Sequence, residues 1–171
     1  MGCNHADFLG YFLSGVSAGA TIEHYVGMHA IGHGSWQFEL EERELKHVCL
    51  QGMLLFHPFF TCEHEEEPPP LVAGWAKFSN DHSLVDPLSP KAPPLAAVPL
   101  FPACIFVGGD DALNQSAIEY CKELVQAEKK AKLSIAEGET HVFHILKPAS
   151  PNVIPVLNEA KNFISQFKHS V

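Results

Sequence analysis

Short apolar runs alternate with helix-like segments along this sequence, and the alternation restricts the folds that it can adopt. Each run stops near a glycine, a proline or a polar turn, which is the pattern of a short buried strand. Strands that alternate with helices favour an α/β fold, in which a mostly parallel sheet is flanked by helices. The predicted strands lie at 11–15, 52–57, 103–107 and 132–135, and the predicted helices at 18–29, 116–130 and 153–167.

The middle of the sequence has a different composition. Residues 62–102 hold most of the 13 prolines, and an acidic run from Glu63 to Glu67 lies at their start. Proline breaks helix interiors and cannot donate to a strand ladder, so this segment is expected to form an irregular cap or surface excursion. It is too short for a second domain, and we expect residues 1–171 to form a single, truncated domain.

Charge and cysteine content exclude several classes of partner. Lys and Arg number 11 against 20 Asp and Glu, and the formal charge of −9 disfavours phosphate backbones and anionic membranes. No apolar run approaches the roughly 20 residues of a membrane-spanning helix. The five cysteines are scattered without a C-x-x-C pair, and the sequence shows no signal-peptide-like apolar stretch at its start. These features predict a soluble, cytoplasmic protein that does not bind nucleic acid.

The residues Gly15-Val16-Ser17-Ala18-Gly19 form a G-x-S-x-G motif between a predicted strand and a predicted helix. In that context the motif is typical of a nucleophile elbow, a sharp turn that presents the serine hydroxyl at the helix N-terminus. The glycines allow the tight turn, and the backbone N–H of Ala18 can donate to a developing oxyanion. The alternative is a turn of small residues in which Ser17 is only the helix N-cap.

A serine nucleophile needs a histidine base, and the histidine needs a carboxylate to orient it. Asp111 follows the predicted strand at 103–107, and His141 lies in a loop further along the chain. The order serine, acid, histidine is the chain order of α/β hydrolases. Asp110 competes with Asp111 for the acid role, and either could instead be a solvated loop residue or a helix N-cap. We expect Asp111 to be the acid.

Four segments, in the same order and with similar spacing, match the motifs of one protein family. They are YFLSGVSAGA at 11–20, LLFHPFF at 54–60, GDDAL at 109–113 and HVFHILKP at 141–148. They resemble the plant carboxylesterase family, within the hormone-sensitive-lipase-like group, and the similarity covers the C-terminal half of such a protein. The resemblance implies an α/β-hydrolase fold, an acyl-enzyme, small or medium ester substrates, and relatives that act as dehydratases or hormone receptors. It also implies that His141 is catalytic, whereas His144 falls on the following strand and is structural.

The sequence departs from that family's pattern at its start and beside the serine. The family's oxyanion hole is completed by an upstream His-Gly-Gly-Gly loop, which this sequence does not contain. His33 and Gly34 are a poor substitute, because they follow Ser17 in the chain. Val16 stands where the family usually has aspartate. We therefore expect a partial α/β-hydrolase fold that lacks the N-terminal strands and the oxyanion loop.

Two further expectations concern partners and ligands. Without upstream strands the strand at 11–15 is an apolar sheet edge, which favours a homodimer or pairing with a partner chain. The histidines do not form a metal set, because only His29 and His33 have helical i, i+4 spacing and no acid or cysteine completes the site. His24 and the Cys62-x-His64 pair are equally incomplete, so we expect neither a metal nor a cofactor.

Three hypotheses follow for the function. The first is a serine carboxylesterase in which Ser17 attacks the ester, His141 transfers the proton, Asp111 orients His141 and the N–H of Ala18 supports the oxyanion. The second is a catalytically impaired binding or interaction protein, which the missing oxyanion loop favours. The third is a dehydratase-type lyase that uses the same site, with His141 as the base.

Overall fold

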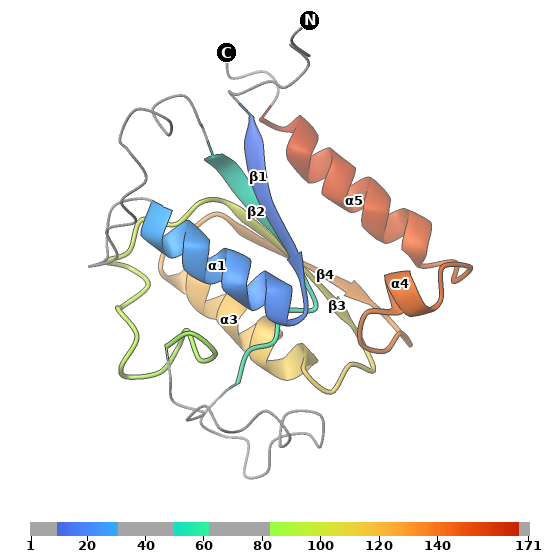
Figure 1. Cartoon of the computed structure of the whole chain (residues 1–171), viewed down its shortest axis with the longest axis horizontal. Coiled ribbons are helices and arrows are strands. Elements are labelled where there is room, and N and C mark those ends of the chain that lie inside the picture. The colour runs from blue at the N-terminus through green and yellow to red at the C-terminus, as the bar shows by residue number, and fades with distance from the viewer. Residues whose placement is uncertain (1–9, 31–49, 62–82, 168–171) are drawn as a thin grey trace, which may run out of the picture.

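The computed structural model describes residues 10–30, 50–61 and 83–167. The elements of this part are β1 (Tyr11–Val16), α1 (Ala18–Ala30), β2 (Leu50–Phe56), β3 (Ala103–Gly108), α3 (Asn114–Gln126), β4 (Ala131–Ala136), α4 (Phe143–Leu146) and α5 (Val153–Ser165). Within it, the strands pair in parallel to form a four-stranded sheet in the order β1-β2-β3-β4 (Figure 1). The predicted α/β fold with a parallel sheet is confirmed.

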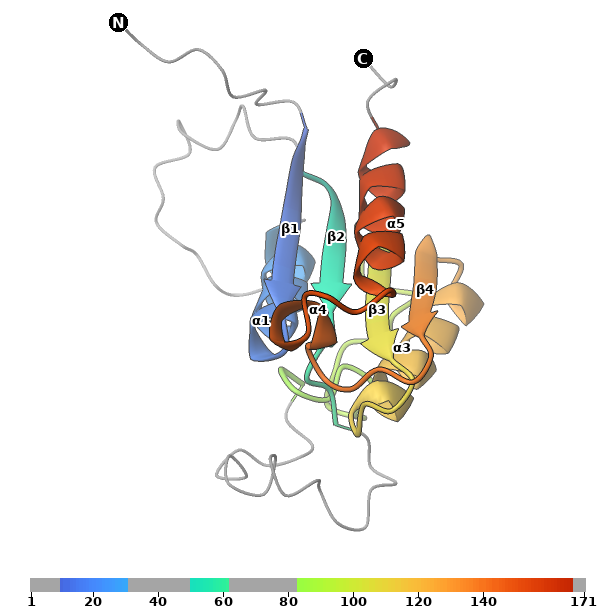
Figure 2. The ribbon, with the colours of Figure 1, turned by 90° about the vertical axis from the view of Figure 1, so that its right-hand side faces the viewer.

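Helices cover both faces of the sheet (Figure 2). The helices α1 and α3 lie against one face, and α5 lies against the other. A parallel sheet that is buried on both faces needs apolar side chains on both sides of each strand. In β3, whose six residues are all buried, Ile105 packs with the α1 and α3 core and Phe106 packs with the α5 core. This double burial explains why the strands are continuous apolar runs in the sequence.

The register of the strands brings their carboxyl ends to one rim of the sheet. Val16 pairs with Phe56, Phe56 pairs with Phe106, and Phe106 pairs with Ser134. The loops that follow the four strands therefore start close together in space, although they are far apart in the sequence. Ligand sites of open α/β sheets form at this rim.

Two predicted elements end earlier than expected, in each case because the backbone turns into the left-handed region. The helix predicted to end at residue 130 ends at Gln126, because Glu128 has a φ of 59° and the N–H of Lys129 bonds back to the carbonyl of Leu124. The strand predicted to include His57 ends at Phe56, because His57 has a φ of 48°.

The prediction for His144 was also wrong in its secondary structure. His144 lies in the short helix α4, not on a strand. Helix α4 starts after Val142, whose φ of 47° turns the chain, and its Phe143 packs into the α5 core. The segment after His141 is therefore a helical turn, and it buries Phe143.

The proline-rich segment is described from residue 83 onward, while 62–82 lie outside the described residues. Residues 83–102 consist of turns and bends without a helix or strand, and Leu88, Leu95 and Leu100 pack against the α1 and α3 core. That residues 62–102 form a cap within one domain stays a prediction. In the part of the chain that the structure describes, no helix has the length and apolar character needed to cross a membrane.

Candidate active site

The G-x-S-x-G motif forms a sharp elbow between β1 and α1. Ser17 lies at the turn with a φ of 55°, and its N–H bonds to the carbonyl of Phe56 on the neighbouring strand at 2.9 Å. The turn is so tight that a Cβ atom on Gly15 would lie 2.4 Å from the carbonyl carbon of Gly19. The elbow can form because Gly15 has no side chain. The elbow places the Ser17 hydroxyl at the start of α1, on the rim where the strands end.

Ser17, His141 and Asp111 form one hydrogen-bonded row across this rim. The distance from Ser17 Oγ to His141 Nε2 is 2.9 Å, and that from His141 Nδ1 to Asp111 Oδ2 is 2.8 Å. The side chain of His141 is 22% exposed whereas that of Asp111 is 1% exposed. The row thus runs from a partly accessible hydroxyl to a buried carboxylate, and it joins residues 124 positions apart in the chain.

Asp111 accepts three hydrogen bonds from N–H donors. His141 and His57 both contact Oδ2, at 2.8 and 2.9 Å, and the N–H of Leu113 donates to Oδ1 at 3.0 Å. Burial acts to raise the pKa of Asp111, but the hydrogen bonds from His141, His57 and Leu113 outweigh it and hold the pKa well below its usual range. Asp111 is therefore an ionised carboxylate at neutral pH.

The ionised carboxylate determines which ring nitrogens carry protons. An ionised Asp111 can only accept, so His141 and His57 must each donate from Nδ1. In a neutral His141 this leaves Nε2 unprotonated, and Nε2 is the atom that faces the Ser17 hydroxyl. A histidine in this tautomer can remove the proton of a serine that attacks a carbonyl.

The two neighbouring aspartates have different positions. Asp110 is exposed, and its N–H bonds to the carbonyl of Glu139 at 2.9 Å. Asp111 is buried, with 4% of its surface exposed, and points into the row. The backbone before them is equally confined, because a Cβ on Gly108 would lie 2.2 Å from the carbonyl oxygen of Glu139. This close approach fixes the loop that carries His141 against the end of β3.

Ala18 is the first residue of α1 and is exposed. The first N–H groups of an α-helix have no acceptor within the helix, so the N–H of Ala18 is available to a ligand at the elbow. The other residues considered for the oxyanion, His33 and Gly34, lie outside the described residues.

His57 is a member of the site to which the sequence assigned no role. It follows β2, is 1% exposed and bonds to Asp111 Oδ2, whereas Leu113 bonds to Oδ1. One rule could have located it: the loops that follow parallel strands share a rim of the sheet. Since β2 lies between β1 and β3, which precede Ser17 and Asp111, the residue after β2 should lie near both.

His144 stacks on His57, with ring centroids 5.4 Å apart and an angle of 10° between the planes. Burial lowers the pKa of His144, and the neighbouring rings of His57 and His141 lower it further. Its Nδ1 atom is buried, and the structure places no hydrogen-bond partner beside this atom among the described residues. His144 is thus a neutral ring that packs behind the row at neutral pH.

Three potential metal ligands meet in the same place. His57, Asp111 and His141 each have a ligand atom within 4.8 Å of the others. Both Nδ1 atoms carry protons that they donate to Asp111, however, and a protonated nitrogen has no lone pair for a metal. The other histidines considered do not join this group: His24 bonds through Nε2 to the hydroxyl of Tyr120, and the His29 and His33 side chains lie outside the described residues, as do Cys62 and His64.

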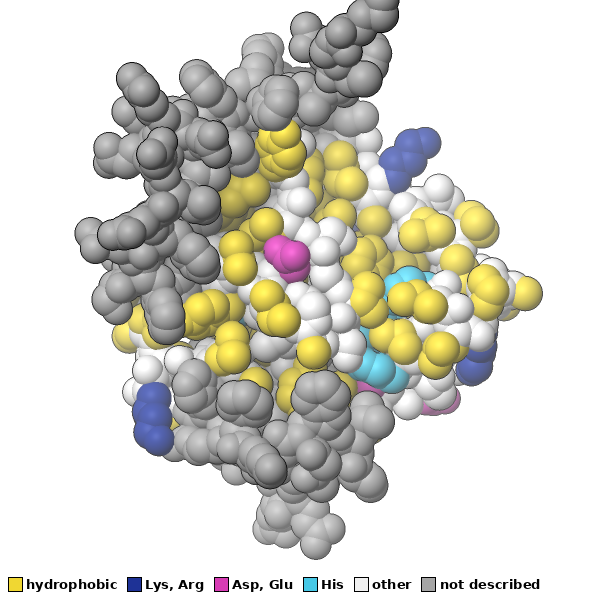
Figure 3. Space-filling view, in the orientation of Figure 1, with side chains coloured by type: hydrophobic (Ala, Val, Ile, Leu, Met, Phe, Trp, Pro, Cys, Tyr) yellow, Lys and Arg dark blue, Asp and Glu magenta, His cyan; other side chains and the backbone are white. Residues whose placement is uncertain are grey.

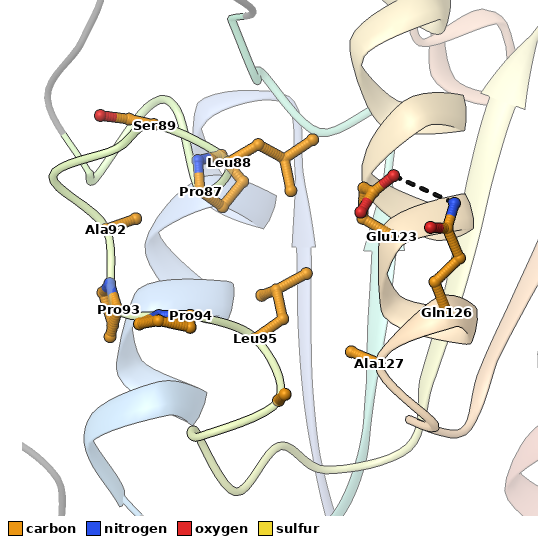
Figure 4. Close-up of a pocket in the computed structure, with 11 residues that line it drawn as sticks. Pro87, Leu88, Ser89, Ala92, Pro93, Pro94, Leu95, Glu123, Gln126 and Ala127 are labelled. Atoms are coloured by element: carbon orange, nitrogen blue, oxygen red, sulfur yellow. Dashed lines mark hydrogen bonds between the residues drawn. The ribbon is translucent and has the colours of Figure 1, made fainter.

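A cavity of about 370 Å³ lies away from the row (Figure 4). Residues from 87–96 and from the last turns of α3 line it, and Gln126 donates to Glu123 Oε1 there at 3.1 Å. Since α3 starts shortly after Asp111 and its 13 residues span about 20 Å, the cavity lies at the opposite end of this helix from the row. The two features are therefore separate.

Comparison with known proteins agrees with this architecture. The chain matches a family of proteins with the α/β-hydrolase fold over residues 3–145. It is 28% identical over 178 residues to probable carboxylesterase 2 of Arabidopsis thaliana, covering 95% of this chain and 53% of that protein. It is 27% identical over 180 residues to 2-hydroxyisoflavanone dehydratase of Glycyrrhiza echinata, covering 94% and 51%. Among solved structures, the apo form of Thermogutta terrifontis esterase 2 matches with a TM-score of 0.64 at 18% identity, covering 92% of this chain and 55% of that one.

These matches confirm the resemblance to plant carboxylesterases that the four sequence motifs indicated. The solved structure shows the same fold, and the chain spans about half the length of the curated relatives that it matches. Since the family match extends over residues 3–145 of 171, the chain belongs to the α/β-hydrolase fold family.

Proposed function

We propose that this chain carries the catalytic triad of a carboxylesterase, with Ser17 as nucleophile, His141 as proton carrier and Asp111 as the residue that orients His141. The observation that carries the proposal is the row of contacts at 2.9 and 2.8 Å from the Ser17 hydroxyl through His141 to Asp111. Its relatives include a protein named probable carboxylesterase, which supports an ester as the substrate. The resemblance to plant carboxylesterases favours esters with small or medium acyl groups.

In the proposed reaction, Ser17 Oγ forms a bond to the ester carbonyl carbon while His141 Nε2 takes the hydroxyl proton. The tetrahedral intermediate then collapses, the bond to the alcohol breaks, and His141 gives its proton to the departing alkoxide. Water attacks the acyl-enzyme by the same route and releases the acid and free Ser17. Asp111, ionised and buried, stabilises the His141 cation that exists between these transfers.

The developing oxyanion needs hydrogen-bond donors close to Ser17. The N–H of Ala18 meets this need, because it lies at the N-terminus of α1, where the helix dipole also favours negative charge. One donor of this kind contributes about 10²- to 10³-fold to the rate in other serine hydrolases. Labelling needs a single attack by Ser17 on each molecule, so a covalent label is a more sensitive readout than turnover.

The test is covalent labelling with a fluorophosphonate probe, together with hydrolysis of p-nitrophenyl acetate. We expect labelling at Ser17, found by mass spectrometry of the digested protein, and no labelling in Ser17→Ala. Ser14→Ala is the matched control, because Ser14 is an exposed serine on β1 outside the row, and it should label as the unchanged chain does. A folded sample that neither labels nor hydrolyses the ester would reject the proposal and favour the binding protein.

A lyase is the second candidate, because one relative is named as a dehydratase. In that reaction His141 Nε2 would remove a proton from carbon while a hydroxide leaves, and no bond to Ser17 would form. Elimination that persists in Ser17→Ala but is lost in His141→Ala would support the lyase over the esterase. Loss of elimination in both variants would contradict it.

Self-association and location remain predictions. Among the described residues β1 pairs with β2 alone, and Figure 3 shows hydrophobic side chains exposed on the face where α1 lies. In α1, Ile22 is 56% exposed and Val26 is 43% exposed. These features support the predicted homodimer or partner chain, which size-exclusion chromatography with light scattering tests. The predicted cytoplasmic location would be tested by imaging a tagged chain in cells.

A further inference from the structure

His57 donates to the same oxygen of Asp111 as the proposed proton carrier. The Nδ1 atoms of His57 and His141 lie 2.9 and 2.8 Å from Asp111 Oδ2, and the His57 side chain is 1% exposed. Burying a polar ring costs free energy unless it is hydrogen-bonded, and the carboxylate provides that partner. His57 and His141 therefore share one carboxylate oxygen, and His57 can act on His141 through it.

The backbone at His57 is strained, and neighbouring strands hold it in place. Its φ of 48° is uncommon for a residue other than glycine, and the following residue, Pro58, restricts it further. The N–H of His57 bonds to the carbonyl of Phe106 at 2.7 Å, and the N–H of Phe59 bonds to the carbonyl of Ser17 at 3.4 Å. Strain of this kind persists where the surroundings impose it, often at functional sites. Here it turns the His57 ring from the end of β2 toward Asp111.

Together with Leu113, His57 holds the Asp111 carboxylate without help from His141. The N–H of Leu113 fixes Oδ1 at 3.0 Å, and Nδ1 of His57 fixes Oδ2 at 2.9 Å. Two donors on two oxygens define the plane of the carboxylate. His141 can therefore move or change its charge during a reaction while its acceptor stays in place. His57 also withdraws negative charge from the oxygen that His141 uses.

We propose that His57 is a positioning residue, which aims Asp111 Oδ2 at His141 and limits how strongly this oxygen favours the protonated form of His141. The inference rests on the proposed esterase function. Among the described residues, the titratable side chains recorded against His57 are Asp111, His141 at 5.4 Å between ring centroids and the stacked His144. Of these only Asp111 is hydrogen-bonded to both His57 and His141, so His57 acts on His141 through it.

The test replaces His57 by residues that differ in the donor they offer. His57→Phe keeps a ring but removes the donor. His57→Asn keeps an N–H near the place of Nδ1, and asparagine tolerates a positive φ. In His57→Gln the amide lies one bond further from the backbone, so its N–H is displaced from the place of Nδ1. This variant replaces His57→Phe in the test if His57→Phe does not fold. His144→Phe is the matched control, because it changes the ring stacked on His57 without touching Asp111.

In His57→Phe we expect kcat for p-nitrophenyl acetate to fall about 10- to 100-fold, while KM stays unchanged. Losses of this size are typical when a residue that orients a reacting group through another side chain is replaced. The acid limb of the pH profile should move to higher pH, because the unshared carboxylate oxygen favours protonated His141 more strongly. His57→Asn should recover most of kcat. His144→Phe should leave both quantities unchanged.

A second readout does not depend on turnover. In protein labelled with ¹⁵N-histidine, the Nδ1–H protons that His57 and His141 donate to Asp111 should give two low-field signals. In His57→Phe one signal should disappear and the remaining one, from His141, should move further downfield. If Ser17 fails to label, the esterase proposal fails, while this spectrum still tests the role of His57. A folded His57→Phe or His57→Gln with an unchanged His141 signal, or with wild-type kcat and acid limb, would overturn the inference.

Discussion

Gly15 and Gly19 are equivalent in the G-x-S-x-G motif, but the structure predicts opposite responses to alanine. A Cβ on Gly15 would lie 2.4 Å from both the carbonyl carbon and oxygen of Gly19 and 2.6 Å from the nitrogen of Ala20. All three are backbone atoms of α1, so no side chain can rotate away. A Cβ on Gly19 meets nothing within 4 Å.

The expected magnitudes follow from these contacts. Relief of the Gly15 contacts needs a shift of α1 by about 1 Å, and overpacking of this kind costs about 1–3 kcal/mol. The same shift stretches the 2.9 Å contact between Ser17 Oγ and His141 Nε2 beyond hydrogen-bonding range. A misplacement of about 1 Å at a reacting group costs on the order of 10²-fold in rate. Gly19→Ala should instead stabilise α1 by up to about 1 kcal/mol, since glycine is the poorer helix former.

The assay combines urea unfolding, followed by circular dichroism, with the rate of fluorophosphonate labelling. We expect Gly15→Ala to lower the urea midpoint and to slow labelling about 100-fold, and Gly19→Ala to raise the midpoint slightly with labelling retained. Equal effects of the two substitutions would refute the reasoning, because the prediction depends entirely on what surrounds each missing Cβ. So would a Gly15→Ala chain that labels at the rate of the unchanged protein.

Three further substitutions test other parts of the site and core. Burial lowers the pKa of His144, so as the pH falls below about 6.5 the unfolded chain binds a proton that the folded protein does not, and the free energy of unfolding decreases. The urea midpoint should therefore fall between about pH 7.5 and pH 5.5, and it should fall less in His144→Phe. Tyr120→Phe removes the buried hydroxyl that bonds to His24 Nε2 at 2.5 Å, and it should lower the free energy of unfolding by about 1–3 kcal/mol. An unchanged free energy of unfolding would mean that water replaces this bond. Asp111→Asn has one acceptor oxygen where three N–H donors converge, so it should disturb the His141 tautomer and reduce kcat about 10⁴-fold. A reduction of kcat by less than about tenfold would contradict the role of Asp111.

The local pattern of the sequence was enough to predict the strands, the main helices and the fold class. A strand buried on both faces must be a continuous apolar run, as 103–107 is, and a glycine must occur where two backbone segments touch, as Gly15 does. Such requirements act on neighbouring residues and leave a visible mark in the sequence. The order of Ser17, Asp111 and His141 likewise pointed to one rim.

The tertiary structure decided which side chains meet at that rim. It buries Asp111 and exposes Asp110, although the sequence favoured one over the other only weakly. It places His57 on the same carboxylate as His141 and places His144 in a helix behind it. These outcomes depend on the register between strands and on left-handed turns, which bring together residues 30 or more positions apart. Contacts over such separations are set by how the whole sheet packs, and no local periodicity encodes them.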